Sequence, residues 1–132
     1  MKAQDRFKFR AWYEKDKEMI YFDFDLINDE SRAFYKESIE GSEIMQCTGL
    51  KNKNGKLIYE GDIFEAITGY QREVFEVFFS QGSFGAANIG NHGKHRFILH
   101  EYLSGNYHLK LEEIRIIGNI YETPELLGGE DD

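Results

Sequence analysis

The segment from Ile44 to Ile63, IMQCTGLKNKNGKLIYEGDI, constrains the fold more than any other part of this chain. It places two turn signals, Asn54-Gly55 and Glu60-Gly61-Asp62, between three short apolar runs. Asn-Gly adopts the positive φ angles that a tight hairpin turn requires, and Asp and Gly serve the backbone of turns in general. Short apolar runs joined by such turns predict a β-meander.

An aromatic-rich hairpin is predicted ahead of this segment. The apolar runs Phe7–Tyr13 and Met19–Phe22 flank the charged loop Glu14–Glu18. Alternation places the apolar residues of the first strand on one face and its basic residues on the other, with Phe7, Phe9 and Ala11 opposite Lys8 and Arg10. A two-stranded hairpin is marginal alone, so its aromatic residues should cover the rest of the fold or contact another subunit. The candidate interaction surface consists of Phe7, Phe9, Trp12, Tyr13 and Tyr21.

Beyond the meander, the chain continues to alternate in short runs separated by turn residues. Strands are predicted at Ile63–Ile67, Glu73–Phe79, Ser83–Ala87 and His95–Leu103. The second of these should turn its apolar face inward, because Phe75, Val77 and Phe79 share one face. Two connections are predicted to lack strands: residues 23–41, a loop with up to two helical turns, and residues 88–94, a polar excursion.

The C-terminal part carries two further signals. Apolar residues change phase between Leu111 and Ile114, which predicts a bulge or break near Glu112-Glu113. Thr123-Pro124 has the pattern of an N-cap followed by proline at the first position of a short closing helix. The expected core contains Tyr59, Ile63, Phe75, Val77, Ile116 and Ile120. Turn or bulge glycines, where alanine is costly if φ is positive, are predicted at Gly49, Gly55, Gly61 and Gly118.

Composition limits the class of protein. Eleven Phe, eight Tyr and thirteen Gly against one Pro fit a β-rich folded chain with many tight turns. A net charge of −8 argues against nucleic-acid binding, which relies on Lys and Arg displacing counterions from phosphates. The single cysteine, Cys47, fits a reducing compartment. No signal-peptide region and no run of ~18 apolar residues is present, so we expect a soluble, intracellular protein without a membrane span.

No chemical motif withstands inspection. His92, His95, His100 and His108 suggest a metal site, but His95 and His100 point to opposite faces of one predicted strand, and no HExxH pattern is present. Gly93-Lys94 lacks the other residues of a phosphate-binding loop. Cys47 has no basic neighbour to activate it. The carboxylates Glu60 and Asp62 lie in a turn. We therefore predict no catalytic, cofactor-binding or metal-binding residue and no enzymatic activity.

Three blocks of the sequence, Phe9–Trp12, Ile44–Ile63 and Ile117–Leu127, together resemble the YopX family of small proteins, which are encoded mostly by phages and prophages. Cys47 stands where the family often has an aromatic residue. The motif positions are Trp12, Thr48, Gly49, Leu50, Asn54, Gly55, Tyr59, Glu60, Gly61, Asp62, Gly118, Asn119 and Tyr121.

The resemblance implies a mainly β fold with a small SH3-type barrel over residues 44–127 that ends in a short C-terminal helix. A hairpin and an irregular or short-helix segment over residues 1–43 would precede it, and residues 128–132 would form an acidic disordered tail. It also implies a phage or prophage origin in a bacterial host cytoplasm, and it carries over no catalytic residues.

The leading functional hypothesis is a non-enzymatic accessory protein that contacts a host or phage protein and self-associates into a homo-oligomer. The alternative is a nucleic-acid-associated binding module that uses the barrel surface and exposed aromatic residues. A small hydrolase with an unrecognised histidine or carboxylate site is the third hypothesis.

Overall fold

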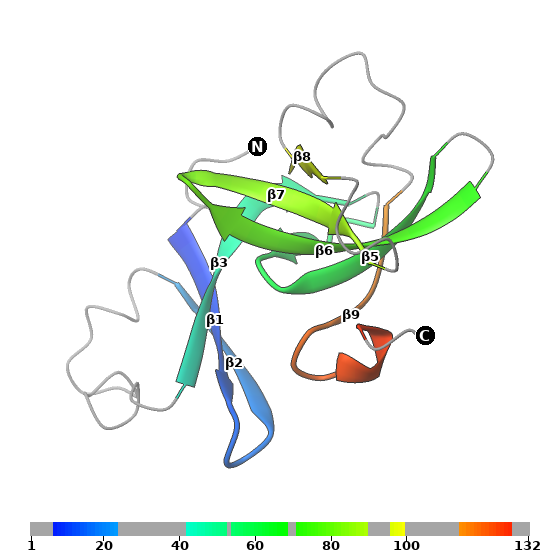
Figure 1. The fold of residues 1–132 in the computed structure, drawn as a ribbon. Coiled ribbons are helices and arrows are strands. Elements are labelled where there is room, and N and C mark those ends of the chain that lie inside the picture. Colours follow the sequence, from blue (N-terminus) through cyan, green and yellow to red (C-terminus); the bar gives the residue numbers. More distant parts are fainter. Residues whose placement is uncertain are drawn as a thin grey trace.

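Antiparallel strands dominate the structure of this protein, a computed structural model that describes residues 7–23, 42–52, 54–68, 71–89, 96–99 and 114–127 (Figure 1). The described strands are β1 (Lys8–Tyr13), β2 (Glu18–Asp23), β3 (Ser42–Lys51), β4 (Leu57–Tyr59), β5 (Asp62–Thr68), β6 (Gln71–Ser80), β7 (Ser83–Asn88), β8 (Arg96–Ile98) and β9 (Arg115–Asn119). The mainly β fold predicted from the sequence is therefore confirmed.

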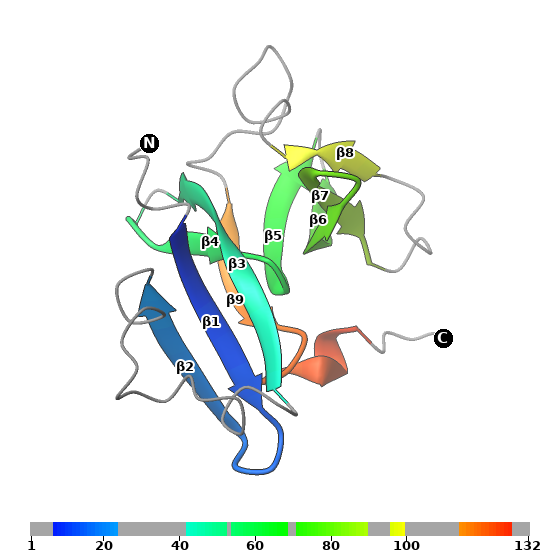
Figure 2. The same cartoon turned by 90° about the vertical axis from the view of Figure 1, so that its left-hand side faces the viewer.

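The predicted N-terminal hairpin is present and belongs to a larger sheet. This N-terminal sheet has the order β2-β1-β3-β4, and Figure 2 shows β2, β1 and β3 side by side. β1 pairs antiparallel with both neighbours, so Ala11 lies opposite Ile20 on one side and Ile44 on the other. The hairpin is thus hydrogen-bonded directly to the first strand of the meander.

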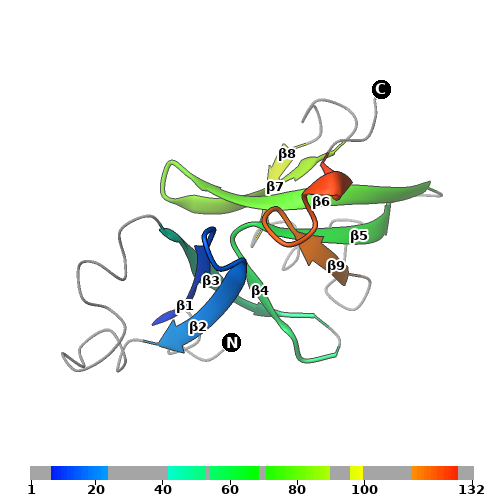
Figure 3. The ribbon, with the colours of Figure 1, turned by 90° about the horizontal axis from the view of Figure 1, so that it is seen from below.

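The second sheet has the order β8-β7-β6-β5-β9. Ile63 pairs with Gly118 while Phe64 pairs with Ile116, so Ile117 is an extra residue in β9. A bulge of this kind bends its strand and increases the local twist. β9 accordingly bends, and the chain that follows it leads towards the N-terminal sheet, as Figures 1 and 3 show.

The main core lies on the inner face of the second sheet. Phe64 and Phe75 are cross-strand partners in β5 and β6, and their rings stack with centroids 5.2 Å apart. Around them lie Ile58, Ala66, Val77, Phe84, Ala86, Leu99 and Ile114, all buried. Tyr59, Ile63, Phe75 and Val77 are buried as predicted, whereas Ile116 and Ile120 are half-buried.

Two expectations for this sheet are wrong in detail. Phe79 was expected to face the core with Phe75 and Val77, but it is 47% exposed. It lies two residues before the turn at Gln81, beyond the last core residue of β6, and packs edge-on against Phe84. Asn88 was expected to begin the polar excursion, yet it is the buried last residue of β7, opposite Phe75.

Three of the four predicted glycines have the positive φ that L residues rarely adopt, namely Gly49, Gly55 and Gly61. Gly118 has no positive φ and is required for a different reason. A Cβ atom there would lie 2.0 Å from Thr123 Oγ1 and 3.1 Å from Leu126 Cδ1. Close packing, and not backbone conformation, excludes a side chain at this position.

The C-terminal segment forms a single turn of 3-10 helix, Pro124–Leu126, in place of the predicted closing helix. Proline does occupy a first-turn position, but the Thr123 side chain makes no capping bond. Its hydroxyl instead donates to the Asn119 carbonyl and accepts from the Asn119 N–H, at 2.9 and 3.0 Å. The threonine therefore holds the preceding turn and does not start a helix.

Several expectations fall outside the described residues: the loop or short helix between β2 and β3, the bulge near Glu112-Glu113, most of the polar excursion, most of the strand predicted at His95–Leu103, and the C-terminal tail. All four histidines also lie there. Among the residues that are described, no helix has the length and apolar character needed to cross a bilayer.

Candidate functional site

Two charged side chains of the described residues are buried, and they form an ion pair between the N-terminal hairpin and the meander. Arg10 in β1 and Asp62 at the start of β5 are each 2% exposed, with Arg10 Nη2 2.9 Å from Asp62 Oδ1. The same nitrogen donates to the Glu60 carbonyl at 3.0 Å, and the guanidinium lies 4.9 Å from the centre of the Tyr59 ring. We call Arg10, Tyr59, Glu60, Gly61 and Asp62 the clamp.

Both carboxylates of the clamp accept backbone N–H groups, and that of Asp62 also pairs with Arg10. Asp62 Oδ2 accepts the N–H of Tyr59 at 2.7 Å, which closes the turn between β4 and β5. Glu60 Oε1 accepts the N–H of Gln46 at 3.3 Å, and the Glu60 N–H donates to the Gln46 carbonyl at 2.9 Å. Both acids thus serve the turn, in agreement with the interpretation drawn from the sequence.

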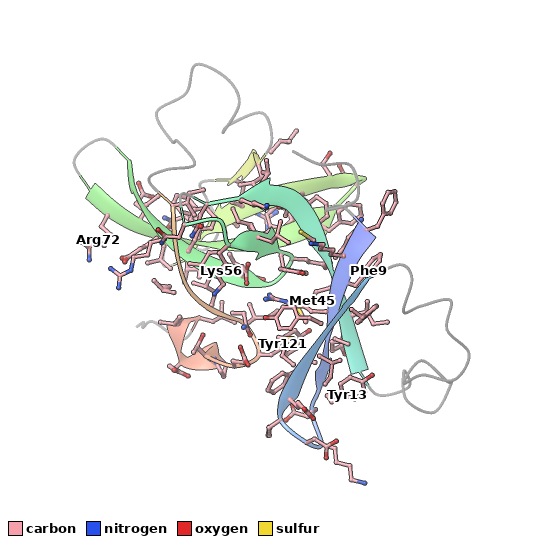
Figure 4. The ribbon with its side chains drawn as sticks, turned by 180° about the vertical axis from the view of Figure 1, so that it is seen from behind. Phe9, Tyr13, Met45, Lys56, Arg72 and Tyr121 are labelled. Atoms are coloured by element: carbon pink, nitrogen blue, oxygen red, sulfur yellow. The ribbon has the colours of Figure 1, made fainter. Side chains whose placement is uncertain are left out.

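Gly61 joins the clamp to the second sheet. Its N–H donates to the Val77 carbonyl at 2.8 Å, and its carbonyl accepts the N–H of Ile120 at 2.9 Å. A Cβ atom at this glycine would lie 3.0 Å from Met45 Sδ and 3.6 Å from Arg10 Nη2. Figure 4 shows Met45 and Tyr121 in this region, between the N-terminal sheet and the turn after β9.

Burial determines the ionisation of the clamp. Loss of hydration raises the pKa of the Asp62 carboxyl, while the Arg10 charge and the Tyr59 N–H oppose that rise. Burial also raises the pKa of the Tyr59 phenol to about 12. Buried charges are tolerated only when they are paired and hydrogen-bonded, which explains why every oxygen of Asp62 has a partner. The arrangement favours structural stabilisation over proton transfer.

A second polar cluster fixes the turn after β9. Asn119 Oδ1 accepts the N–H groups of Tyr121 and Glu122 at 3.0 and 2.8 Å, an Asx-type turn. The turn presents the Tyr121 ring to Trp12 of β1, and the two rings stack with centroids 5.9 Å apart. This aromatic contact is a further connection between the two sheets.

The motif positions of the second block have equally local roles. Thr48 Oγ1 donates to the Ile58 carbonyl at 2.8 Å and so ties β3 to β4 within the register shift between Cys47 and Lys51. Asn52 Oδ1 accepts the N–H groups of Asn54 and Lys56, each at 3.0 Å, which shapes the turn containing Gly55. Leu50 packs partly buried against the main core.

The five residues of the candidate interaction surface do not form one exposed patch. Trp12 is buried, and its indole N–H donates to Glu14. Phe9 and Tyr13 are half-buried, and Phe9 stacks on Phe22 at 5.6 Å. Phe7 and Tyr21 are 48% and 54% exposed, and the Tyr21 ring meets Tyr59 edge-on. In Figure 4, Phe9 and Tyr13 lie towards opposite ends of β1.

Sequence reasoning missed the role of Arg10. Alternation assigned it correctly to the face opposite Phe9, but that face is covered by the clamp and is not solvated. The available signal was Trp12, which has the same parity as Arg10 and marks an apolar environment on that face. Among the described residues, no group of three His, Cys, Asp or Glu side chains could hold a metal ion.

These observations define a class: small, mainly β proteins in which a buried arginine–aspartate clamp and a polar turn join two antiparallel sheets. A family model described as YopX protein matches residues 8–128. The chain therefore belongs to the YopX family.

Two solved structures are similar to this chain. Protein yopX from Bacillus subtilis gives a TM-score of 0.59 at 22% identity, over 92% of this chain and 98% of that one. Protein EF1440 from Enterococcus faecalis gives a TM-score of 0.51 at 25% identity, over 91% and 96%. No curated protein matches the sequence. The two solved structures support the fold, and neither description states a function.

Proposed function

We propose that this protein is a non-enzymatic accessory protein of a phage or prophage, working in the bacterial host cytoplasm through protein contacts and self-association. The observation that carries the proposal is the outer face of the N-terminal sheet, opposite the clamp. Cross-strand pairing gathers on it Phe9, Ala11, Ile20, Phe22 and Ile44, of which Ala11 and Phe22 are buried and Phe9 and Ile20 are half-buried. Ile44 is 46% exposed, and Phe7 at the start of β1 is 48% exposed. Ile44 and Phe7 are thus exposed apolar side chains on this face that a protein partner could cover.

The charges on β2 favour a face-to-face contact between copies over a shared sheet edge. β2 is the outer strand of the N-terminal sheet and begins with Glu18 and ends with Asp23. Charged residues at the ends of an edge strand oppose its pairing with a second copy. The outer face, in contrast, presents apolar groups.

Sedimentation over a range of protein concentrations tests self-association. We expect a concentration-dependent oligomer that Ile44→Asn weakens. Phe79→Asn is the matched control, because Phe79 is 47% exposed but lies on the second sheet. A wild-type protein that remains monomeric at every concentration would contradict self-association. Affinity capture from infected or prophage-induced cells would then test the partner-protein half of the proposal.

The alternative function is a nucleic-acid-associated module. Arg72 and Arg115 favour it, because they are exposed on the second sheet and Figure 4 shows Arg72 extending away from the body. Both, however, pair with Glu65, at 3.4 and 3.1 Å, which reduces their charge towards a phosphate. Salt-sensitive binding of single-stranded DNA would support this alternative, and no binding at low salt would contradict it.

We further propose that β3 to β9 correspond to a barrel of the SH3 type. A continuous antiparallel meander from β5 to β7 supports this assignment, together with the return of β9 to β5 and the bulge that bends β9. An experimental structure in which the two sheets remain open along their length would contradict it.

A further inference from the structure

A hollow of about 410 Å³ opens on the outer face of β6, β7 and β8, remote from the clamp. Its volume is within the range of small-molecule sites, roughly 300–1,000 Å³. Phe78, Ser80, Ser83, Gly85, Arg96 and Ile98 are among the residues that line it.

Strand register makes this hollow a slot with two apolar walls. Phe78, Gly85 and Ile98 are direct cross-strand partners in β6, β7 and β8. These three residues form a row across the strands. Because Gly85 at its centre has no side chain, its backbone forms the floor of the slot, and the side chains of Phe78 and Ile98 form the two walls. Neighbouring strands lie about 4.8 Å apart, which separates the backbones of the two walls by about 10 Å. A planar group can lie on Gly85 between them.

The two sides of the slot are polar and carry a positive charge. Ser80 and Ser83 are cross-strand partners in the adjacent row and supply hydroxyl groups. The Arg96 guanidinium lies 4.8 Å from the centre of the Phe78 ring, a cation–π contact that orients it beside the slot. The described residues of the lining include one cation and no carboxylate, although the protein carries a net charge of −8. The local charge therefore selects for an anion.

Glu76 lies close to Arg96 but outside the hollow. It is half-buried and belongs to the same cross-strand row as Ala87 and Arg96. Burial raises the pKa of the Glu76 carboxyl, and the Arg96 charge opposes that rise, so the two groups interact. Glu76 can hold the arginine side chain in place, although its carboxylate offsets part of the arginine charge.

We propose that this slot binds a small planar apolar molecule bearing one anionic group, either a carboxylate or a phosphate. The ring lies over Gly85 between Phe78 and Ile98, and the anion meets Arg96. Guanidinium groups bind both kinds of anion through paired charge-assisted hydrogen bonds. This site is separate from the face proposed for self-association, so either proposal can fail alone.

Amide chemical-shift titrations with naphthoate and naphthyl phosphate test the site. We expect shifts centred on Gly85 and its strand neighbours, and the tighter of the two probes identifies the preferred anion. Neutral naphthalenemethanol should bind more weakly than either. Arg96→Gln should weaken naphthoate binding by about fivefold or more. Arg72→Gln is the matched control, since it removes an equal charge from the same sheet outside the slot.

A second variant tests the apolar half of the site. Gly85→Val suits a strand and fills the floor of the slot, so it should abolish binding while Arg96→Gln only weakens it. Shifts centred elsewhere, or none up to the solubility limit of the probes, would overturn the proposal. Equal naphthoate affinity for the wild type and Arg96→Gln would overturn it as well.

Discussion

The pairing of Arg10 with Asp62 shows how single residues connect distant parts of this chain. The two residues are far apart in sequence, and both are nearly inaccessible to water. Taking such charges out of water is unfavourable, so the pair need not add net stability relative to apolar residues. Removing only one of the two residues is destabilising, because the remaining charge would be buried without a partner. The clamp therefore specifies how the hairpin docks.

Asp62→Ala should destabilise the protein by about 3–5 kcal/mol, because it leaves Arg10 buried and uncompensated. Glu65→Ala is the control: its arginine partners are largely exposed, so its loss should change the free energy of unfolding by less than about 1 kcal/mol. Urea unfolding measures both. Similar values for the two variants would show that the buried pair has no special role.

The Tyr59 phenol gives the clamp a pH dependence at alkaline pH. Its folded-state pKa is raised from 10 to about 12, so the folded state favours the neutral phenol. This contribution is fully present below pH 10 and is lost as the pH rises towards about 12. The free energy of unfolding should fall less steeply in Tyr59→Phe than in the wild type across that window. Parallel slopes in urea unfolding would contradict the assignment.

Among the structural elements, the turns are the ones that the sequence predicts best. Asn54-Gly55 and the turn at Gly61 were predicted from residue type, because positive φ strongly favours glycine. Burial of Arg10 could not be predicted in this way, since it depends on which element covers the second face of β1. Gly118 is an intermediate case. The need for glycine there was predicted, but the steric reason for it depends on where the fold places Thr123.

Gly118→Ala should disrupt the turn after β9, because the new methyl group would overlap Thr123. We expect a loss of about 1–3 kcal/mol, the usual range for overpacking. The chain has a single tryptophan, Trp12, whose ring stacks on Tyr121 of this turn. Its fluorescence should therefore change in Gly118→Ala.

Gly55→Ala is the control for that experiment, as it strains a positive φ with no atom within 4 Å of the new group. It should lower stability by about 1 kcal/mol and leave the Trp12 emission of the folded protein unchanged. If both variants shift the emission equally, the fluorescence does not report the turn after β9.

At the scale of the whole molecule, the two sheets are joined through residues that the family motifs contain. Arg10 reaches the Glu60 carbonyl, Ile120 bonds to Gly61, and Trp12 stacks on Tyr121. The polar and glycine residues of the motifs thus serve the docking of one sheet on the other. The sequence revealed the motifs and most strands, but it could not show this shared purpose, which exists only between segments far apart in the chain.

The same contacts determine whether the sequence-based division at residue 44 describes independent units. A fragment of residues 44–127 would lose β1, and with it the strand that pairs with β3 and the guanidinium that neutralises Asp62. It would also expose Met45, which is 3% exposed in the intact chain. We expect this fragment to show no cooperative urea transition, and a peptide of residues 7–23 added in trans to restore one. Peptide in which Arg10 is replaced by Gln is the control and should restore it less well. A fragment that unfolds cooperatively alone would establish residues 44–127 as an independent domain and reduce the hairpin to an accessory.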